Sequence, residues 1–392
     1  MIRIYEKKNC TGCSACVNIC PVNAITFAED TEGFNYPIVN EKKCINCEQC
    51  NRICPIINTV KVENNYIIPK VYASWNIDEE VRINSTSGGV FSAIAEKFID
   101  ENGIVVGAEY TEDFSIRHTF ITDKEGIARL RQSKYAQSDL SDVFKKIKKL
   151  LTEGKKILFC GTPCQVAGLK SFLKKDYDNM YLCDFICRGI ASQKVYKKYL
   201  LSVQNKMGAT IKKIQFKNKD FGWNLFSTKI ELNSGEFYHK DRYNDEYMVG
   251  YLKYNLFIRP ACHSCKFKKL PRVSDITLGD FWGIGEKSKE LDSDKGTSVV
   301  LLNTKKGENL FEKIREKTII CEECYLEDVV KGNTCLFNTV PEGNYRNYFF
   351  NHIENEDFID LIHKIINKAV WERNDLSFKD RIYLIKKRIL KK

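Results

Sequence analysis

From about residue 71 onward, short apolar runs alternate with stretches in which apolar residues recur at helical spacing. The runs predict strands at residues 71–75, 104–110, 156–160, 181–187, 275–282 and 297–304. The periodic stretches, several of which stop at Gly, predict helices at residues 88–103, 141–154, 161–175, 191–208 and 305–317. This alternation is typical of an α/β domain.

Three segments depart from this pattern. Residues 58–70 are polar and aperiodic, which predicts a linker. Residues 211–260 alternate apolar and polar positions between Gly and Asn turns, which predicts an antiparallel excursion. From about Phe358 the chain is predicted to be mostly helical.

The composition narrows the class of protein. A chain of 392 residues has room for two or three domains. It contains no apolar run near the roughly 20 residues of a membrane span, and its first residues lack the apolar core of a secretory signal. We therefore expect a cytoplasmic protein without an integral membrane segment. Its 17 cysteines then indicate metal or cluster ligation, because cytosolic thiols are kept reduced.

The net charge of +11 is uneven, since residues 379–392 alone carry seven basic residues and one Asp. The basic residues do not interleave with aromatics along a recognisable domain, so we expect no nucleic-acid partner. A solvated helical tail is the simplest interpretation. An acidic redox partner, or peripheral contact of the basic tail with a membrane surface, stays open.

Two motifs near the N-terminus have the spacing of two-cluster ferredoxins. Residues 10–21 and 44–55 each read C-x2-C-x2-C-x3-C-P, in which the fourth Cys binds the other cluster. Zinc sites use two pairs of thiolates rather than two runs of four. We expect one 4Fe–4S cluster on Cys10, Cys13, Cys16 and Cys54 and a second on Cys44, Cys47, Cys50 and Cys20.

Five further motifs occur in order along the rest of the chain: STSGGVFSAIAEKF, SKYAQS, FCGTPCQVAGLK, DFICRG and SDITLGDFWGIG. Together they resemble the coenzyme F420 (deazaflavin) hydrogenase/dehydrogenase beta-subunit family, in a form with a fused N-terminal two-cluster ferredoxin. The resemblance covers residues 1–345. It implies FAD, a third 4Fe–4S cluster, a small-molecule substrate, and a redox partner such as ferredoxin or a reduced coenzyme. FMN in place of FAD, use of the deazaflavin coenzyme and oligomerisation stay open.

The resemblance also implies a division of the chain. The expected fold is an α+β ferredoxin-like two-cluster domain, then an α/β flavin-binding domain with an antiparallel insertion and a helical C-terminal tail. The expected boundaries are residues 1–60 for the ferredoxin domain, 61–70 for the linker, 71–345 for the FAD and 4Fe–4S domain, and 346–392 for the basic helical tail.

Three stretches are candidates for FAD contact. Hydroxyls and glycine backbone before a helix form an anion site, although Ser87 as a plain helix cap is the simpler alternative. The GTP turn follows a strand at the edge where ligands of open α/β sheets collect, and a plain turn is its alternative. The candidates are Ser85, Thr86, Ser87, Gly88, Gly89, Ser133, Lys134, Tyr135, Gln137, Gly161, Thr162 and Pro163.

Nine cysteines lie outside the ferredoxin motifs, and the resemblance implies that four of them bind the third cluster. We expect these to be Cys164, Cys187, Cys262 and Cys265. Cys183 is the main rival to Cys164, although Cys160 and Cys183 read as buried small hydrophobes within strands. The CEEC at 321–324 either binds adventitious zinc or has no role.

Arg188 stands where the family usually has histidine, which puts the proton delivery of the family in doubt here. The candidates for proton transfer are Lys134, Tyr135 and Asp280, with Asp184 as a further one. The expected function is an iron–sulfur flavoprotein oxidoreductase that passes electrons between the ferredoxin clusters and FAD. A non-catalytic electron-transfer subunit and a flavin-free redox sensor are the alternatives.

Overall fold

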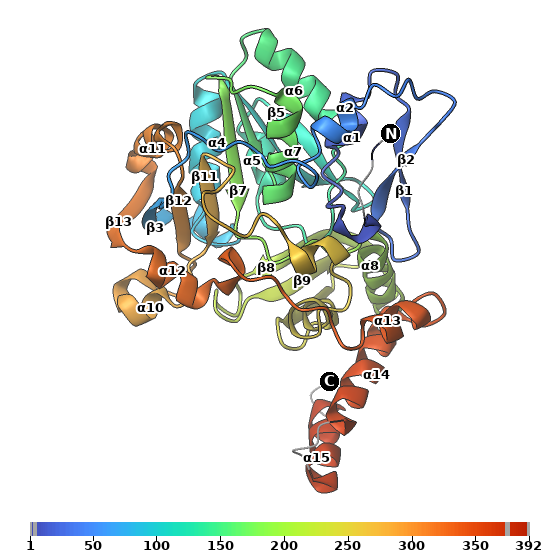
Figure 1. Cartoon of the computed structure of the whole chain (residues 1–392). Coiled ribbons are helices and arrows are strands. Elements are labelled where there is room, and N and C mark those ends of the chain that lie inside the picture. Colours follow the sequence, from blue (N-terminus) through green and yellow to red (C-terminus); the bar gives the residue numbers. More distant parts are fainter. Residues whose placement is uncertain (1, 3–5, 373–376, 390–392) are drawn as a thin grey trace.

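A mixed sheet forms the centre of the computed structural model, which describes residue 2, residues 6–372 and residues 377–389. Its eight strands have the order β13-β3-β12-β11-β7-β6-β4-β5 (Figure 1). Only β4, β6, β7 and β11 run parallel to their shared neighbours, and the other pairings are antiparallel. The bounds are β3 Lys70–Asn76, β4 Ile104–Tyr110, β5 Ile116–Ile121, β6 Ile157–Cys160, β7 Met180–Phe185, β11 Ile276–Asp280, β12 Ser298–Leu302 and β13 Thr318–Cys324.

The six predicted strands are present, so the expectation of an α/β domain is confirmed in its coarse form. The sheet is not parallel throughout, because β12 pairs antiparallel with β11 on one side and with β3 on the other. The edge strands β5 and β13 were not predicted.

Helices cover both faces of the sheet because successive strand residues point to opposite sides. Val106 and Phe159 pack with one set of helices, whereas Val105 and Leu158 pack with the other. The first set is α6 Val143–Thr152, α7 Pro163–Leu173 and α8 Gln193–Met207, and the second is α4 Val90–Asp100 and α11 Lys305–Glu312. All five helices lie where the apolar periodicity predicts them.

The predicted antiparallel excursion is confirmed as a separate three-stranded sheet. It consists of β8 Ile211–Asn218, β9 Ser227–Leu232 and β10 Phe237–Asp241, with β9 in the middle. The chain then passes through α9 Glu246–Met248 and a π-helical turn, Val249–Lys253. The short 3₁₀ turn Pro260–Ser264 follows, and Cys262 lies in it.

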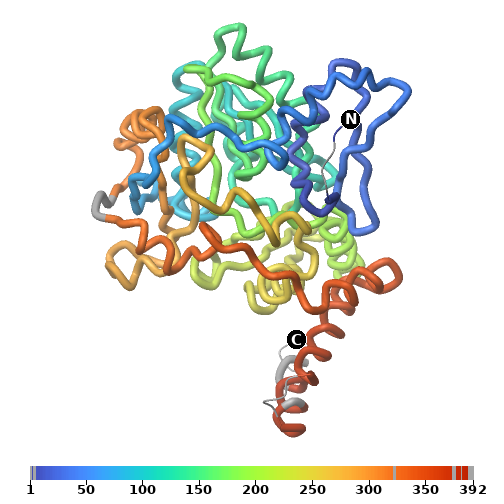
Figure 2. The backbone as a smooth tube through the Cα atoms, in the orientation of Figure 1, coloured from blue at the N-terminus to red at the C-terminus, as the bar shows by residue number. Residues whose placement is uncertain are grey.

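The N-terminal unit is a small α+β module packed against the main body (Figure 2, blue). It contains α1 Ala15–Ile19, the hairpin β1 Ile25–Glu29 and β2 Asn35–Val39, and α2 Gln49–Arg52. Arg259 fixes it to the main body, since its guanidinium donates to the carbonyl oxygens of Cys10 and Asn35. Arg259 is fully buried, so these bonds form without competition from water.

The predicted linker runs over the main body as irregular backbone with its own contacts. The side chain of Asn65 donates to the carbonyl oxygen of Arg272 at 2.7 Å. The amide of Tyr66 donates to the carbonyl oxygen of Asn303, and its hydroxyl reaches Glu308. The segment therefore connects the two units along a defined path.

The C-terminal segment contains α13 Arg346–His352, α14 Phe358–Trp371 and α15 Phe378–Ile389. The apolar face of α14, including Leu361, Ile362 and Ile365, is buried in the main core beside Tyr199 and Phe257. Only the last part can therefore be a solvated tail, and residues 390–392 of that part lie outside the described residues.

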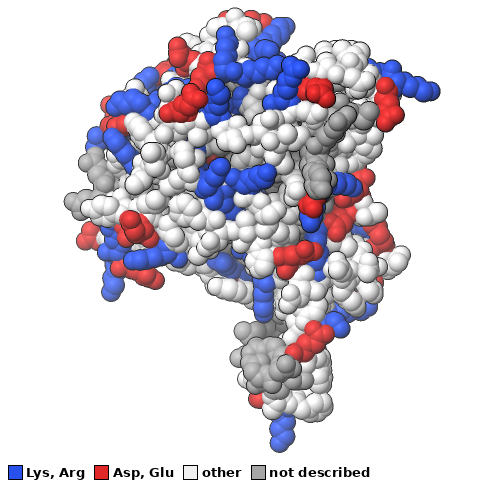
Figure 3. All heavy atoms as spheres, in the orientation of Figure 1, with Lys and Arg blue, Asp and Glu red and all other residues white. Residues whose placement is uncertain are grey.

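Basic and acidic side chains are interspersed over the face of the main body shown in Figure 3. The net positive charge is thus not gathered into one stripe on that face. Within the described ranges, no helix is both long and apolar enough to cross a membrane.

Candidate functional site

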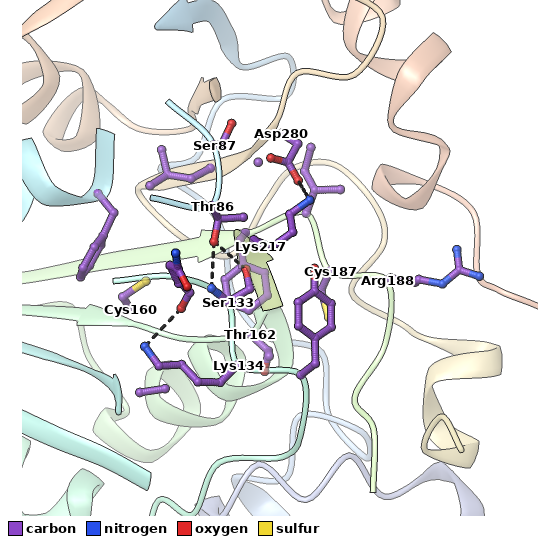
Figure 4. A pocket seen from close by; sticks show the side chains of 18 of the residues that line it. Thr86, Ser87, Ser133, Lys134, Cys160, Thr162, Cys187, Arg188, Lys217 and Asp280 are labelled. Atoms are coloured by element: carbon purple, nitrogen blue, oxygen red, sulfur yellow. Dashed lines mark hydrogen bonds and ion pairs between the residues drawn. The ribbon is translucent and has the colours of Figure 1, made fainter. Parts of the chain in front are cut away.

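A cavity of about 540 Å³ opens at the carboxyl ends of the four parallel strands. The carboxyl ends of neighbouring parallel strands, and the loops that follow them, meet at one sheet edge, where ligands of such sheets collect. All the residues predicted to contact FAD line this cavity except Gly88 and Pro163. Figure 4 shows part of the lining, with Thr86 and Ser133 near its centre and Cys187 and Arg188 on one side.

The first two predicted stretches are joined by hydrogen bonds. The amide of Ser133 donates to the hydroxyl oxygen of Thr86 at 2.8 Å, and the two hydroxyl oxygens lie 3.2 Å apart. Both side chains line the cavity. Two hydroxyls and an adjoining stretch of backbone therefore lie together just before the N-terminus of α4. Groups of this kind bind anions.

The simpler alternative for residues 85–89, a cap made by Ser87, is wrong. The Ser87 hydroxyl donates to the carbonyl oxygen of Thr297, and the cap position is Gly89 in a left-handed conformation. Gly88 lies behind the cavity wall, where a Cβ atom would stand 2.4 Å from the carbonyl oxygen of Ser74. Gly88 therefore allows the loop to pack on β3 rather than facing a ligand.

The GTPC stretch forms a strand-to-helix turn, as the simpler alternative proposes, and it also lines the cavity. Thr162 and Gln165 form a reciprocal capping box at the start of α7. Pro163 is the first residue of the helix and does not reach the cavity, whereas Gly161 and Thr162 line it.

Lys134 and Tyr135 both line the cavity but differ in what their polar atoms do. The Lys134 amine donates to the carbonyl oxygens of Arg129, Arg131 and Gln132, and burial lowers its pKa to about 7. The Tyr135 ring packs edge-on against Phe216 and Tyr251. Among the described residues no group hydrogen-bonds the Tyr135 hydroxyl, and burial raises its pKa, so it stays protonated at neutral pH.

Asp280 lies on the cavity wall with both carboxylate oxygens engaged. One oxygen is 3.1 Å from the Lys217 amine, and the other accepts a 3.0 Å bond from the Trp223 indole (Figure 4 shows the ion pair). Asp184, the further candidate, is fully buried and paired with Arg272 at 2.7 Å. Both carboxylates that line the cavity are therefore neutralised by a partner.

Four cysteines beyond the ferredoxin unit come together beside the cavity. Burial raises the pKa of the Cys187 thiol, and the charges of Cys262 and Cys164 add to that rise. Cys265 acts in the same way on Cys164 and Cys262. Cys187 itself lines the cavity.

Cys183 lies elsewhere. Its thiol is hydrogen-bonded to that of Cys160, and this hydrogen bond and burial both raise the pKa of Cys183. It packs on the face of the sheet that α4 and α11 cover, whereas Cys164 packs on the opposite face. The structure thus groups Cys164, rather than Cys183, with the three other predicted ligands.

The separation of these four thiols limits the kind of metal centre that they can bind. Across the described parts of the chain, no three Cys, His, Asp or Glu side chains are close enough to hold a single metal ion. A 4Fe–4S cube binds each thiolate through a different iron, so its ligands stand farther apart than those of one zinc ion. The amide of Ile190 also donates to the Cys262 sulfur at 3.4 Å, a type of bond that tunes cluster potentials.

The ferredoxin thiols fall into the predicted groups in part. A small hollow is lined by Cys10, Cys13, Cys16 and Cys54 together with Phe27 and Ile56. In the other set, burial raises the pKa of the Cys50 thiol and the nearby Cys47 adds to that rise, and Cys20 accepts a 3.1 Å bond from the amide of Ala24. The first hollow fits a cluster by its four soft donors and its apolar walls.

Several lining residues were not predicted from the sequence. His118 hydrogen-bonds Ser138 and the carbonyl oxygen of Cys160, and burial lowers its pKa to about 4, so it is neutral.

The cationic side chains of the lining outnumber its carboxylates. The cations are Arg131, Lys134, Arg188, Lys217 and Arg242, and the carboxylates are Asp184 and Asp280.

Arg188, at the position where the family usually has histidine, makes hydrogen bonds to a neighbouring segment of the chain. Its guanidinium donates to the carbonyl oxygen of Leu252 and to the side chain of Asn255, each at 2.7 Å. Of the CEEC motif, Cys324 is buried on β13, and the Cys321 side chain lies outside what the structure describes.

The fold and the grouped thiols define an iron–sulfur protein with a ligand cavity, and comparison with known proteins gives its family. Residues 9–57 match a 4Fe-4S dicluster domain. Residues 71–145 and 154–325 match the N-terminal and C-terminal models of the coenzyme F420 hydrogenase/dehydrogenase beta subunit. The chain belongs to this family and is an iron–sulfur protein of the electron-transferring oxidoreductase type.

Two known proteins are similar to this chain. An uncharacterized protein of Methanocaldococcus jannaschii is 25% identical over 349 residues, covering 79% of this chain and 88% of its own. A chain of the F420-reducing [NiFe] hydrogenase complex from Methanosarcina barkeri is 16% identical, with a TM-score of 0.46, covering 82% of this chain and 97% of its own.

The cavity also fits a flavin by its size and charge. Its volume lies within the 300–1,000 Å³ that is typical of cofactor sites. Its excess of cations, with both carboxylates already paired, suits a ligand that carries phosphates. Thr86, Ser133 and Arg131 would hold such phosphates near the start of α4.

Proposed function

We propose that the chain binds FAD in this cavity and passes electrons between its N-terminal clusters and the FAD, to reduce or oxidise a small-molecule substrate. One observation carries the proposal: the cavity that the predicted flavin stretches line is also lined by Cys187, which is grouped with three other thiols. We infer that those thiols hold a third 4Fe–4S cluster, next to the flavin.

FAD bound there would supply two-electron, hydride-equivalent chemistry, which one-electron clusters cannot supply alone. The chain's own residues have separate roles. Thr86 and Ser133 bind the phosphates, and the Lys134 amine fixes the loop that carries Tyr135 by holding three carbonyl oxygens. The Tyr135 hydroxyl, protonated and open to the cavity, is the proton donor that the site offers to a substrate.

The electron partner is a ferredoxin or a reduced coenzyme. The family's description names coenzyme F420, so that coenzyme is one candidate for this role. A cytoplasmic location belongs to the same proposal, since free cluster-ligating thiols require a reducing compartment.

Quantitation of iron, sulfide and flavin in anaerobically purified protein tests the proposal. Three cubes predict about twelve irons per chain, with about one flavin. Protein that contains clusters but no flavin would overturn the proposal in favour of a redox sensor. Extraction and chromatography of the flavin identify it as FAD or FMN.

A second measurement separates an enzyme from a non-catalytic subunit. The chain alone is reduced with dithionite and mixed with candidate substrates, and flavin reoxidation is followed by absorbance. Reoxidation by the chain alone indicates an enzyme. Reoxidation that requires a separate catalytic protein indicates an electron-transfer subunit.

A further inference from the structure

Among the described residues, one cation of the cavity has no polar partner for its side chain. Arg242 follows β10 and lines the cavity, and its Nε is buried without a hydrogen-bond partner. Within the described residues its guanidinium makes no hydrogen bond or ion pair. It lies instead over aromatic rings, 4.7 Å from the centroid of Phe226 and 5.5 Å from that of Trp282. Arg242 as a whole is partly exposed, but a buried guanidinium nitrogen without a partner is costly unless an anion binds it.

The surroundings of Arg242 are rigid and add further positive charge. The Lys217 amine lies over the same two rings, at 3.6 Å and 4.8 Å from their centroids. Trp282 stacks on Trp223 with centroids 4.5 Å apart and planes 6° from parallel. Because Asp280 is bonded to both Lys217 and Trp223, it cannot turn to neutralise Arg242 without breaking those bonds.

We propose that Arg242, with Lys217 behind it, binds the anionic group of the substrate, a carboxylate or a phosphate. The inference rests on the proposed function, because it takes the rest of the cavity as the flavin site. The guanidinium presents donors in a planar fork that matches either anion. Tyr135 lines the same cavity; burial raises the pKa of its hydroxyl, and the nearby charge of Arg242 acts against that rise. An anion held by Arg242 therefore places the remainder of the substrate beside the Tyr135 hydroxyl.

The stretches predicted to hold the flavin lie on another part of the wall. Thr86, Ser133 and Arg131 come from the start of α4 and the loop before α6, whereas Arg242 and Lys217 come from the antiparallel insertion. Two anion-binding groups in one cavity match two ligands, one on each part of the wall.

Calorimetric titration of the full-length, anaerobically purified protein tests the site. Sodium phosphate and sodium acetate are titrated separately, at constant ionic strength kept with chloride. We expect saturable binding of one of them, which identifies the class of anion, and an affinity at least about tenfold weaker in Arg242→Gln. Lys213→Gln makes the same charge change on the exposed side of β8 and should bind as the wild type does.

Arg242→Lys keeps the charge but removes the fork, so it should bind with intermediate affinity if Arg242→Gln fails to fold. Binding of neither anion, or equal binding by wild type and Arg242→Lys or Arg242→Gln, would overturn the site. Loss of flavin from Arg242→Gln, with flavin retained in Lys213→Gln, would also overturn it, because the anion would then be the flavin's own. Flavin content of the wild type tests the proposed function separately.

Discussion

Cys13 of the ferredoxin unit lies directly against Gly168 of α7, where a Cβ atom would stand 3.0 Å from both the Cβ and the Sγ of Cys13. Cys164 is four residues earlier on the same helix, which is about one turn away. The missing side chain at position 168 thus brings a predicted ligand of the first cluster within one helical turn of a predicted ligand of the third.

Gly168→Ala should disturb this contact. Alanine in a helix interior is favoured over glycine by about 1 kcal/mol, so the local effect alone would stabilise α7. The clash with Cys13 should outweigh it and destabilise the protein by about 1–3 kcal/mol. Thermal unfolding measures the effect, and electron paramagnetic resonance of the reduced protein should show weaker coupling between clusters. Ser171→Ala on the same helix is the control, and a Gly168→Ala variant more stable than this control would refute the contact.

Arg259→Met should loosen the ferredoxin unit. The arginine also donates to the side chain of Gln137, so its loss leaves two carbonyl oxygens and one amide oxygen without their donor. We expect a loss of about 3 kcal/mol or more and faster hydrogen exchange in residues 10–16. Arg52→Met removes an exposed arginine of α2 and should change neither quantity. Equal exchange in the two variants would show that Arg259 does not fix the unit.

Cys164→Ala and Cys183→Ala should differ in iron content. Loss of Cys164 removes one of the four grouped thiols, so iron should fall from about twelve to about eight per chain. Cys183→Ala is the matched control, since both residues are buried cysteines of the same domain. The opposite result would make Cys183 the ligand, and no change in either variant would mean that these thiols hold no cluster.

Tyr135→Phe should slow turnover by roughly a hundredfold or more while leaving iron and flavin content unchanged. The change keeps the ring contacts with Phe216 and Tyr251 and removes only the hydroxyl. Tyr243→Phe, at an exposed position, is the control. Turnover at the wild-type rate would exclude the hydroxyl as proton donor.

The buried His118 should make the protein acid-sensitive. Burial lowers its pKa from 6.5 to about 4, so its contribution is complete above pH 6.5. As the pH falls from 6.5 to about 4, the unfolded state binds a proton that the folded state does not bind. The free energy of unfolding therefore falls by about 3 kcal/mol. Denaturant unfolding across this range should show a flatter profile in His118→Gln. His352→Gln in α13 is the control, and equal flattening there would contradict the assignment.

The sequence predicts the central strands well and the edges poorly. β4, β6 and β12 are continuous apolar runs because both faces of the sheet are covered by the chain. β5 and β13 lie at the two edges of the sheet. An edge strand has one solvated side, so polar residues such as Arg117 and Thr119 of β5 interrupt the pattern and no run remains to be recognised.

The site shows the same limit. Motif spacing predicts the ferredoxin cysteines, and the family resemblance implies the three loops and the four further cysteines. Lys217 and Arg242 read as ordinary surface cations, because nothing in the local sequence shows that Phe226 and Trp282 cover them. Burial of a charge by distant aromatic residues is a tertiary property, and only the folded chain reveals it.

Because the ferredoxin unit packs against the main body, its two cluster motifs lie in different environments. Residues 10–12 are buried against the main body, whereas Ile45, in the loop of the other motif, is 61% exposed. One cluster motif therefore faces the main body, and the covalent chain and hydrogen bonds fix its distance from that body. The other faces solvent, where a partner must arrive by diffusion. Under the proposed function, exchange with outside carriers is sensitive to concentration and salt, while onward transfer inside the molecule is not.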